Sequence, residues 1–512
     1  MTQFSLVDGT IVAVYLVTAV AAGIAVRRYV GKVEHFLVAG REVNVYLGVA
    51  SLAATEFGIV TCMYCAQNGF DRGFSGATPG ILMALAMFFV GWTGFGVKPL
   101  RDAGVMTIPE LFERRFGIRV RTLAGVVIAL GGLLNMGVFV KMAGDFLVVV
   151  CGIPQNYLEV TMAALLALVA LYTILGGMVS VLVTDFLQFV VMSASILAVT
   201  VLILLNVGWE TLVDTVSKHY GASGSNPFVP DPATPPGEAP KTGWPFVVFN
   251  ALLQFAVVLT WQTTVQRLLA AKDTRTGRKI YIGTSFFFVC RYLLPALWGI
   301  AALAALGPAP PGESSVLAMP KYLATIVPAG LVGLLVAGML AADMSTDSTY
   351  MLTWASVIYN DVLRPFRKKP WSERRGLLVN RAIVAGIALF LLVYGLSYTP
   401  EQDLWTYLGV TGTIYLSSMS TILIACAYWK RANDWGAIAA VVAGAVVPVG
   451  FLVLEKTEAT KNLAKAIGPY ASGIAAYLLA AAGMVLGSLA KGWLIGPRAG
   501  ETSELPSSTK EA

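Results

Sequence analysis

The sequence has little charge and very little histidine or cysteine. Of its 512 residues, 13% are charged, 57% are hydrophobic and two are histidines. A water-soluble protein of this length would lack the polar side chains to cover its surface, so the composition indicates that lipid is the solvent. The alternating strands of a membrane barrel are not seen, whereas apolar runs of about 20 residues predict helices. We therefore expect an all-α membrane protein.

The scarcity of reactive side chains also argues against several function classes. Cys62 and Cys65 form a Cys-x-x-Cys motif, but no second pair and no βαβ pattern accompanies it. We see no nucleophile spaced with a base and no metal cluster, so the protein is not expected to be an enzyme. The net charge of +7 is typical of the cytoplasmic loops of a membrane protein. It does not indicate a nucleic-acid partner, and no required protein partner is evident.

The apolar runs predict about 13 membrane-spanning helices. They cover residues 8–27, 46–70, 78–100, 121–150, 155–177, 179–207, 244–269, 279–307, 321–363, 377–397, 404–429, 433–455 and 466–490. We expect residues 1–496 to form a single domain, with a loop or short helical cap at 208–242. The polar tail at 497–512 is expected to be disordered.

The loops between these spans differ in charge, which predicts the orientation of the chain. Of 36 lysines and arginines, 27 fall in one set of alternate loops, counting Arg267 at a span end, and 7 in the other set. The positive-inside rule then places the N-terminus outside and the C-terminus inside. The odd number of spans agrees with this orientation.

Some ionisable residues lie within the predicted spans, where they are costly and so indicate function. They are Glu56, Lys141, Asp145, Asp185, Arg291, Asp343 and Asp347. The densest polar run is in the ninth span, where helical periodicity gathers Ala342, Ser345, Thr346 and Thr349, with Ser348 at the edge. Hydroxyl oxygens are ligands for a hard cation, although one or two could simply join helices.

Two carboxylate arrangements have more than one interpretation. Asp343 and Asp347 are four residues apart, so they repel each other unless a cation, a basic side chain or a proton lies between them. The pair could therefore carry a proton in place of another coupling ion. Lys141 and Asp145 are also four apart. They could neutralise each other, or Lys141 could bind a substrate carboxylate.

Several motifs occur in a characteristic order along the chain. They are Phe36-Leu37-Val38-Ala39-Gly40-Arg41, Thr107-Ile108-Pro109-Glu110, Gly176-Gly177-Met178 with Thr184-Asp185 and Gln188, Gln266-Arg267-Leu268-Leu269 and Trp429-Lys430-Arg431. With them, residues 8–490 resemble the sodium:solute symporters. This resemblance implies two inverted five-helix repeats, spans 2–6 and 7–11, covering residues 46–207 and 244–429. The first helix of each repeat would be broken at mid-membrane. Span two offers residues 54–58 for such a break. In span seven the position of the break is not visible in the sequence.

The resemblance also implies ion sites. The common sodium site would use carbonyls of Ala54 and Phe57 with Ala342, Ser345 and Thr346. A second sodium ion would be bound by Asp185, Ser345, Ser348 and Thr349. Sodium is thus the expected coupling ion, although Glu56, Asp343 and Asp347 depart from many relatives and leave proton coupling open.

The solute is expected between spans two, four, seven and eleven, and its candidate ligands are Thr55, Glu56, Lys141, Trp261 and Gln262. Lys141 would favour an organic acid or an amino acid, while Glu56 could receive an amine. The expected function is sodium-coupled symport of a small organic solute across the plasma or inner membrane. A proton-coupled carrier, or a transporter-like channel or sensor, is the alternative.

Overall fold

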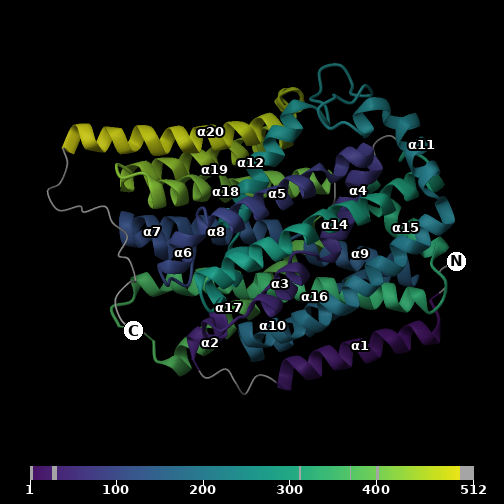
Figure 1. The fold of residues 1–512 in the computed structure, drawn as a ribbon, viewed down its shortest axis with the longest axis horizontal. Helices are drawn as coiled ribbons and strands as arrows, with labels where there is room; N and C mark the ends of the chain where they lie inside the picture. The colour runs from purple at the N-terminus through teal and green to yellow at the C-terminus, as the bar shows by residue number, and fades with distance from the viewer. Residues whose placement is uncertain (1–3, 26–31, 311–312, 370, 399–402, 496–512) are drawn as a thin grey trace.

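The computed structural model describes residues 4–25, 32–310, 313–369, 371–398 and 403–495, and this part of the chain is almost entirely helical. Figure 1 shows the helices side by side, with α1 on one flank and α19 and α20 on the other. The predicted tail at 497–512, like Arg27 and Arg28 of the first loop, lies outside the described residues. Within them, 11 helical segments are long and apolar enough to cross a membrane. This supports the all-α membrane class.

The first half of the chain forms α1 to α11. Their bounds are α1 Leu6–Ala25, α2 Val33–Val38, α3 Val45–Thr55, α4 Ile59–Arg72, α5 Thr78–Thr93, α6 Val97–Asp102, α7 Ile108–Phe116, α8 Ile118–Met136, α9 Phe139–Cys151, α10 Leu158–Val207 and α11 Trp209–Tyr220. Helix α10 is interrupted at Gly177, whose φ of 54° suits glycine. This kink coincides with the predicted boundary between the fifth and sixth spans. The predicted cap at 208–242 is partly helical, as α11.

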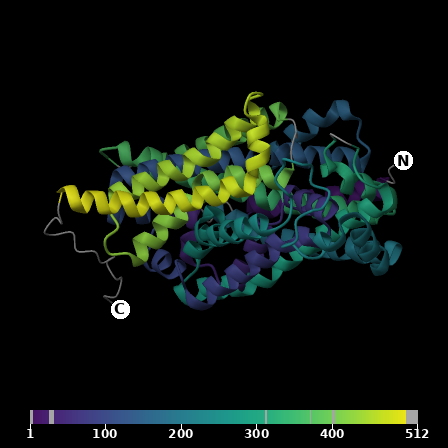
Figure 2. The same cartoon turned by 90° about the horizontal axis from the view of Figure 1, so that it is seen from above.

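The second half forms α12 to α20. Their bounds are α12 Trp244–Thr260, α13 Gln262–Ala270, α14 Thr274–Leu306, α15 Ala318–Ile326, α16 Leu331–Val357, α17 Glu373–Ser397, α18 Leu404–Tyr428, α19 Asp434–Lys456 and α20 Lys461–Ile495. Figure 2 shows the bend in α20, which lies at Gly468 beside Pro469. Helix α16 continues into a π-helical turn, Ile358–Leu363. Most residues of α16 are buried, so this helix runs through the interior of the bundle.

The predicted break in span two is confirmed. Helix α3 ends at Thr55 and α4 begins at Ile59. A Cβ at Gly58 would lie 2.9 Å from Thr346 Oγ1 of α16. Glycine therefore permits the broken backbone to approach α16 closely.

The break that the resemblance implied for span seven is also present, although no local signal marks it in the sequence. Trp261 has an extended backbone (φ −66°, ψ 111°) between α12 and α13. One predicted span is wrong. The span expected at 321–363 is divided, since α15 ends at Ile326 and α16 begins only at Leu331. Pro328 and Gly330 lie between them and interrupt the helix.

One assignment to a loop is also wrong. Arg267 was counted among the basic loop residues, but it lies in α13 with 0% of its surface exposed. A fully buried guanidinium group needs a partner inside the protein. The location of that partner makes Arg267 part of the candidate site.

Candidate functional site

Oxygen atoms from α16 and from the break between α3 and α4 converge at the centre of the bundle. The Ser345 hydroxyl donates to the carbonyls of Ala54 (2.9 Å) and Ala342 (2.8 Å). The Thr346 hydroxyl donates to the carbonyls of Thr55 (2.8 Å) and Ala342 (3.0 Å). We call these three carbonyl and two hydroxyl oxygens the oxygen cage.

The cage contains four of the five residues named for the first sodium site, and it adds the carbonyl of Thr55. Phe57 is fully buried at the same break, where its N–H donates to the Ala54 carbonyl (3.2 Å). The hydroxyl groups can turn their lone pairs toward a cation in place of their present bonds. Neutral oxygen ligands at a helix break suit a small, hard ion.

Two of the four residues named for a second sodium site, Asp185 and Thr349, bind an arginine in this structure. Asp185 Oδ2 lies 3.1 Å from Arg267 Nη2, and both side chains are fully buried. The same nitrogen donates to the hydroxyls of Thr55 and Thr349, each at 2.6 Å. Ser51 donates to Asp185 at 2.5 Å. A sodium ion bound directly to Asp185 Oδ2 would thus have to displace or share the place of the guanidinium group.

The two carboxylates of α16 have no such partner among the described residues. Asp347 is 0% exposed and Asp343 is 1% exposed. Both oxygens of Asp347 and Oδ2 of Asp343 are buried without a hydrogen bond in the described part of the chain. Ser348 belongs to the same helix, and its hydroxyl donates to the Ser345 carbonyl at 3.3 Å.

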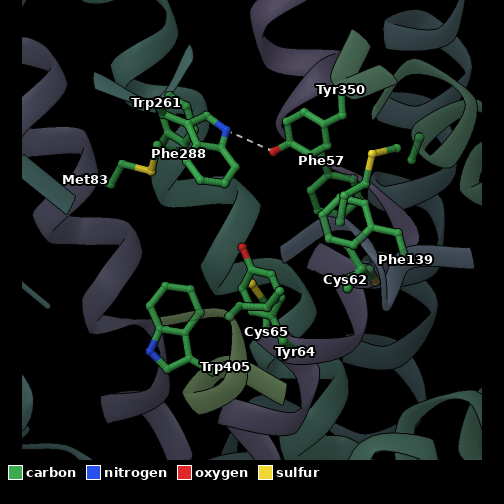
Figure 3. Packing of buried hydrophobic residues seen from close by; sticks show 14 of the residues in the cluster. Phe57, Cys62, Tyr64, Cys65, Met83, Phe139, Trp261, Phe288, Tyr350 and Trp405 are labelled. Atoms are coloured by element: carbon green, nitrogen blue, oxygen red, sulfur yellow. Dashed lines mark hydrogen bonds between the residues drawn. The ribbon is translucent and has the colours of Figure 1, made fainter. Parts of the chain in front are cut away.

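A cavity of about 70 Å³ lies beside the breaks in α3/α4 and α12/α13. It is lined by Glu56, Val60, Thr61, Tyr64, Met83, Asn135, Phe139, Leu253, Gln254, Val257, Trp261, Arg291, Tyr292, Tyr350, Trp405, Leu408, Gly409, Gly412 and Leu416. Figure 3 shows Trp261 joined to Tyr350 on one side, with Tyr64 and Trp405 opposite them. The Trp261 indole N–H donates to the Tyr350 hydroxyl at 3.1 Å. Aromatic walls with a few polar groups are typical of a small-molecule site.

Glu56 and Arg291 bring opposite charges to this cavity. Glu56 Oε1 accepts hydrogen bonds from Thr263 (2.9 Å) and Thr264 (3.1 Å) in the first turn of α13. Its other oxygen, Oε2, lies 3.4 Å from Arg291 Nη1. The breaks in two separate helices therefore meet through a single carboxylate.

The structure separates the five predicted solute ligands. Glu56 and Trp261 line the cavity, whereas the Thr55 side chain faces the Arg267 cluster. Gln262 Oε1 accepts from the backbone N–H of Ile108 at 3.3 Å. Lys141 lies outside the cavity lining and bonds to Asp145 at 2.7 Å. The structure thus agrees with one of the two interpretations left open, in which Lys141 and Asp145 neutralise each other.

We therefore predict that Lys141 does not bind the solute. Replacing Lys141 and Asp145 together with Met and Leu should leave the KM for uptake within about twofold of the wild-type value, because paired charges can be exchanged for apolar side chains. Uptake measured in proteoliposomes would check this. A tenfold increase in KM, with an unchanged melting temperature, would instead place Lys141 in the solute site.

Sequence reasoning did not assign several of the grouped residues to the site. Arg291 was recognised as an intramembrane charge but was given no role. Tyr64, Tyr292, Tyr350 and Trp405 lie far apart in the sequence, and aromatic residues in apolar spans are usually core. Only the fold brings these side chains around one cavity.

Broken helices, buried oxygen ligands and a central cavity define a multi-pass membrane transporter. A family model described as "Sodium:solute symporter family" matches residues 36–444. The chain belongs to this family, as predicted from the motifs, and is therefore a transporter and not an enzyme.

Similar proteins of known function are sodium cotransporters and a proline transporter. Sodium/mannose cotransporter SLC5A10 of Bos taurus is 28% identical, with 88% of this chain and 80% of the relative covered. Sodium/glucose cotransporter 4 of Danio rerio is 26% identical, with 89% and 73% covered. The osmoregulated proline transporter OpuE of Bacillus subtilis (strain 168) is 24% identical, with 71% and 70% covered.

A solved structure supports the fold. A Na+-coupled sialic acid symporter, in a substrate-bound outward-open state, aligns with a TM-score of 0.77. The alignment covers 95% of this chain and 98% of that one, at 17% sequence identity. At this identity the likeness concerns the fold alone.

Proposed function

We propose that this protein is a sodium-coupled symporter that carries a small organic solute, an organic acid or an amino acid, by alternating access. The observation that supports this most is the oxygen cage, whose hydroxyl-to-carbonyl distances are 2.8–3.0 Å. A sodium ion in the cage holds α16 to the broken helix α3/α4. Glu56, at that same break, lines the solute cavity, so ion and solute binding are coupled through the same backbone segment.

The transport cycle uses the membrane potential as well as the sodium gradient. Each positive charge moved inward gains about 2.3 kcal/mol per 100 mV. We infer thirteen spans with the N-terminus outside. Ends on opposite sides, as an odd number of spans requires, agree with Figure 1, where α1 begins at one end of the bundle and α20 ends at the other. We propose the cage as the first sodium site, and the second site, like the first, stays a prediction.

Charged networks at both ends of the bundle support alternating access. Toward the end that we assign to the outside, Arg72 of α4 bonds to Asp403 at the start of α18. Toward the opposite end, Arg121 of α8 bonds to Asp361 after α16 at 2.9 Å. A path to the cavity from either side opens when one network separates while the other stays closed.

Proton coupling is the second candidate, and the observation that favours it is the pair Asp343 and Asp347. Two buried carboxylates without a basic partner among the described residues are costly unless a proton or a cation is bound. In this version the proton would travel on α16, next to the oxygen cage.

Replacing sodium tests the two candidates directly. In proteoliposomes with an imposed sodium gradient, solute uptake at fixed pH should fall at least tenfold when sodium is replaced by choline. The control is the same experiment with a pH gradient and no sodium. Uptake that follows the pH gradient and ignores sodium would contradict sodium coupling and support the proton.

A further inference from the structure

Arg291 reaches the cavity with unused hydrogen-bonding capacity. A guanidinium group has five N–H donors. Arg291 makes one hydrogen bond of ordinary length, to the Tyr64 hydroxyl at 2.9 Å, and two at 3.4 Å, to Thr61 and Glu56. Its Nε is buried without a partner in the described part of the chain. Since the side chain is 7% exposed, water can accept few of the remaining N–H hydrogen bonds. An anionic group of a ligand would accept them.

Glu56, next to Arg291, presents the opposite charge and also has unused hydrogen-bonding capacity. Its Oε1 is fixed by two threonine hydroxyls of α13, whereas the contact of Oε2 with Arg291 is only 3.4 Å. Oε2 is thus the oxygen available to a ligand. A fixed carboxylate with one available oxygen suits an ammonium group.

The two groups together select the charge of the ligand. A simple carboxylate at Arg291 would be repelled by Glu56, and a simple amine at Glu56 would be repelled by Arg291. A neutral sugar could bond to neutral polar groups of the lining, such as Asn135 and Gln254, but it would bring no charge to Glu56 or to Arg291. A ligand with both charges satisfies both residues.

The distance between the charges and the size of the cavity limit the ligand further. Glu56 Oε2 and Arg291 Nη1 are 3.4 Å apart, so a bridging ligand must carry its own two charges close together. In an α-amino acid, a single carbon separates the ammonium nitrogen from the carboxylate. The cavity of about 70 Å³ also favours a compact molecule, whose apolar part would meet the rings of Tyr64, Trp261 and Trp405.

From this geometry we infer that the solute is a compact, neutral α-amino acid, with its carboxylate on Arg291 and its ammonium group on Glu56. This inference rests on the proposed function, because it names the substrate class of the same transporter. It assigns the specificity for the solute to Glu56, at the break between α3 and α4, and to Arg291 of α14, in place of Lys141. The aromatic rings contribute apolar contact and weak attraction for the ammonium group.

A ligand panel on the purified full-length protein tests the inference. The neutral α-amino acids are screened by thermal shift with sodium present, and the strongest binder is compared with its amide and its deaminated acid by calorimetry. Loss of either charge should weaken binding roughly 10- to 150-fold, the range for a hydrogen bond to a charged group. γ-Aminobutyrate, whose charges are farther apart, should also bind weakly. The inference is overturned if no neutral amino acid shifts the melting temperature, or if the amide and the deaminated acid bind as tightly as the parent.

Variants assign the two roles. Glu56→Gln should weaken the amino acid but not its deaminated acid, and Arg291→Lys should weaken the amino acid but not its amide. Exposed residues of the same type, in Glu159→Gln and Arg119→Lys, serve as matched controls and should change neither affinity. Equal affinities in the Glu56, Arg291 and control variants would overturn the assignment. If either site variant fails to fold, the panel on the wild-type protein still decides.

These binding measurements, combined with uptake into proteoliposomes, separate this inference from the proposed function. Amino-acid binding that is unaffected by sodium would leave the inference standing and contradict sodium coupling. Sodium-driven uptake of glucose or myo-inositol, without amino-acid binding, would leave sodium coupling standing and overturn the inference.

Discussion

Replacing Asp185 by alanine is expected to destabilise the folded protein by about 3–5 kcal/mol, the usual cost of breaking a buried ion pair. The reason is the remaining partner. Arg267 is 0% exposed and lies 3.1 Å from Asp185 Oδ2, so the variant would bury an uncompensated positive charge. We expect little monodisperse protein and a strongly lowered melting temperature in detergent, both of which fluorescence-detected gel filtration and differential scanning fluorimetry measure.

Removing both charges should reverse most of that loss. In the double variant Asp185→Leu with Arg267→Met, neither charge is buried, and apolar replacement of a buried pair is often neutral or stabilising. The matched control is Glu238→Ala, which breaks the exposed pair with Lys465 and should cost about 0–1 kcal/mol. A double variant as unstable as Asp185→Ala would contradict the ion-pair explanation, as would an Asp185→Ala protein of normal melting temperature.

The ion pair also shows why part of the site could not be predicted from sequence. Arg267 lies near the end of the seventh predicted span, five residues before Lys272. It was therefore counted with the basic residues of the following loop. Its partner Asp185 is 82 residues away along the chain. No local periodicity relates the two positions, and only the packing of α3 against both α10 and α13 brings them together.

Local signals did predict other features. The oxygen stripe of α16 follows from helical periodicity alone, because Ala342, Ser345 and Thr346 lie on one face of any helix. The break near Gly58 has a glycine to mark it, and so has the kink at Gly177. The break at Trp261 has neither glycine nor proline, and what accompanies it is the distant Glu56 carboxylate, which accepts hydrogen bonds from Thr263 and Thr264 just after the break. Long-range contacts of this kind leave no pattern in the local sequence.

Removing the hydroxyls of the oxygen cage is expected to abolish the response to sodium while leaving the protein folded. Ser345→Ala and Thr346→Ala should each raise the half-saturating sodium concentration roughly 10- to 150-fold. This range follows from the loss of one interaction with a charged group, which contributes about 1.5–3 kcal/mol to binding. The double variant should show no sodium-stimulated uptake in the physiological range. Each hydroxyl otherwise bonds neutral carbonyls, so the stability cost is only about 0.5–1.5 kcal/mol per residue.

Two further variants make this result specific to the cage. Thr346→Ser keeps the oxygen and should keep the sodium response. Thr18→Ala removes an exposed hydroxyl that bonds to its own helix, at the Val14 carbonyl, and should resemble the wild-type protein. Uptake measured against sodium concentration, together with the melting temperature of each variant, separates loss of ion binding from loss of folding. If the double variant has a wild-type sodium response, the ion binds elsewhere. Asp343 and Asp347 of the same helix would then be the next residues to replace, because they directly follow cage residues and carry buried carboxylate oxygens without a hydrogen bond in the described part of the chain.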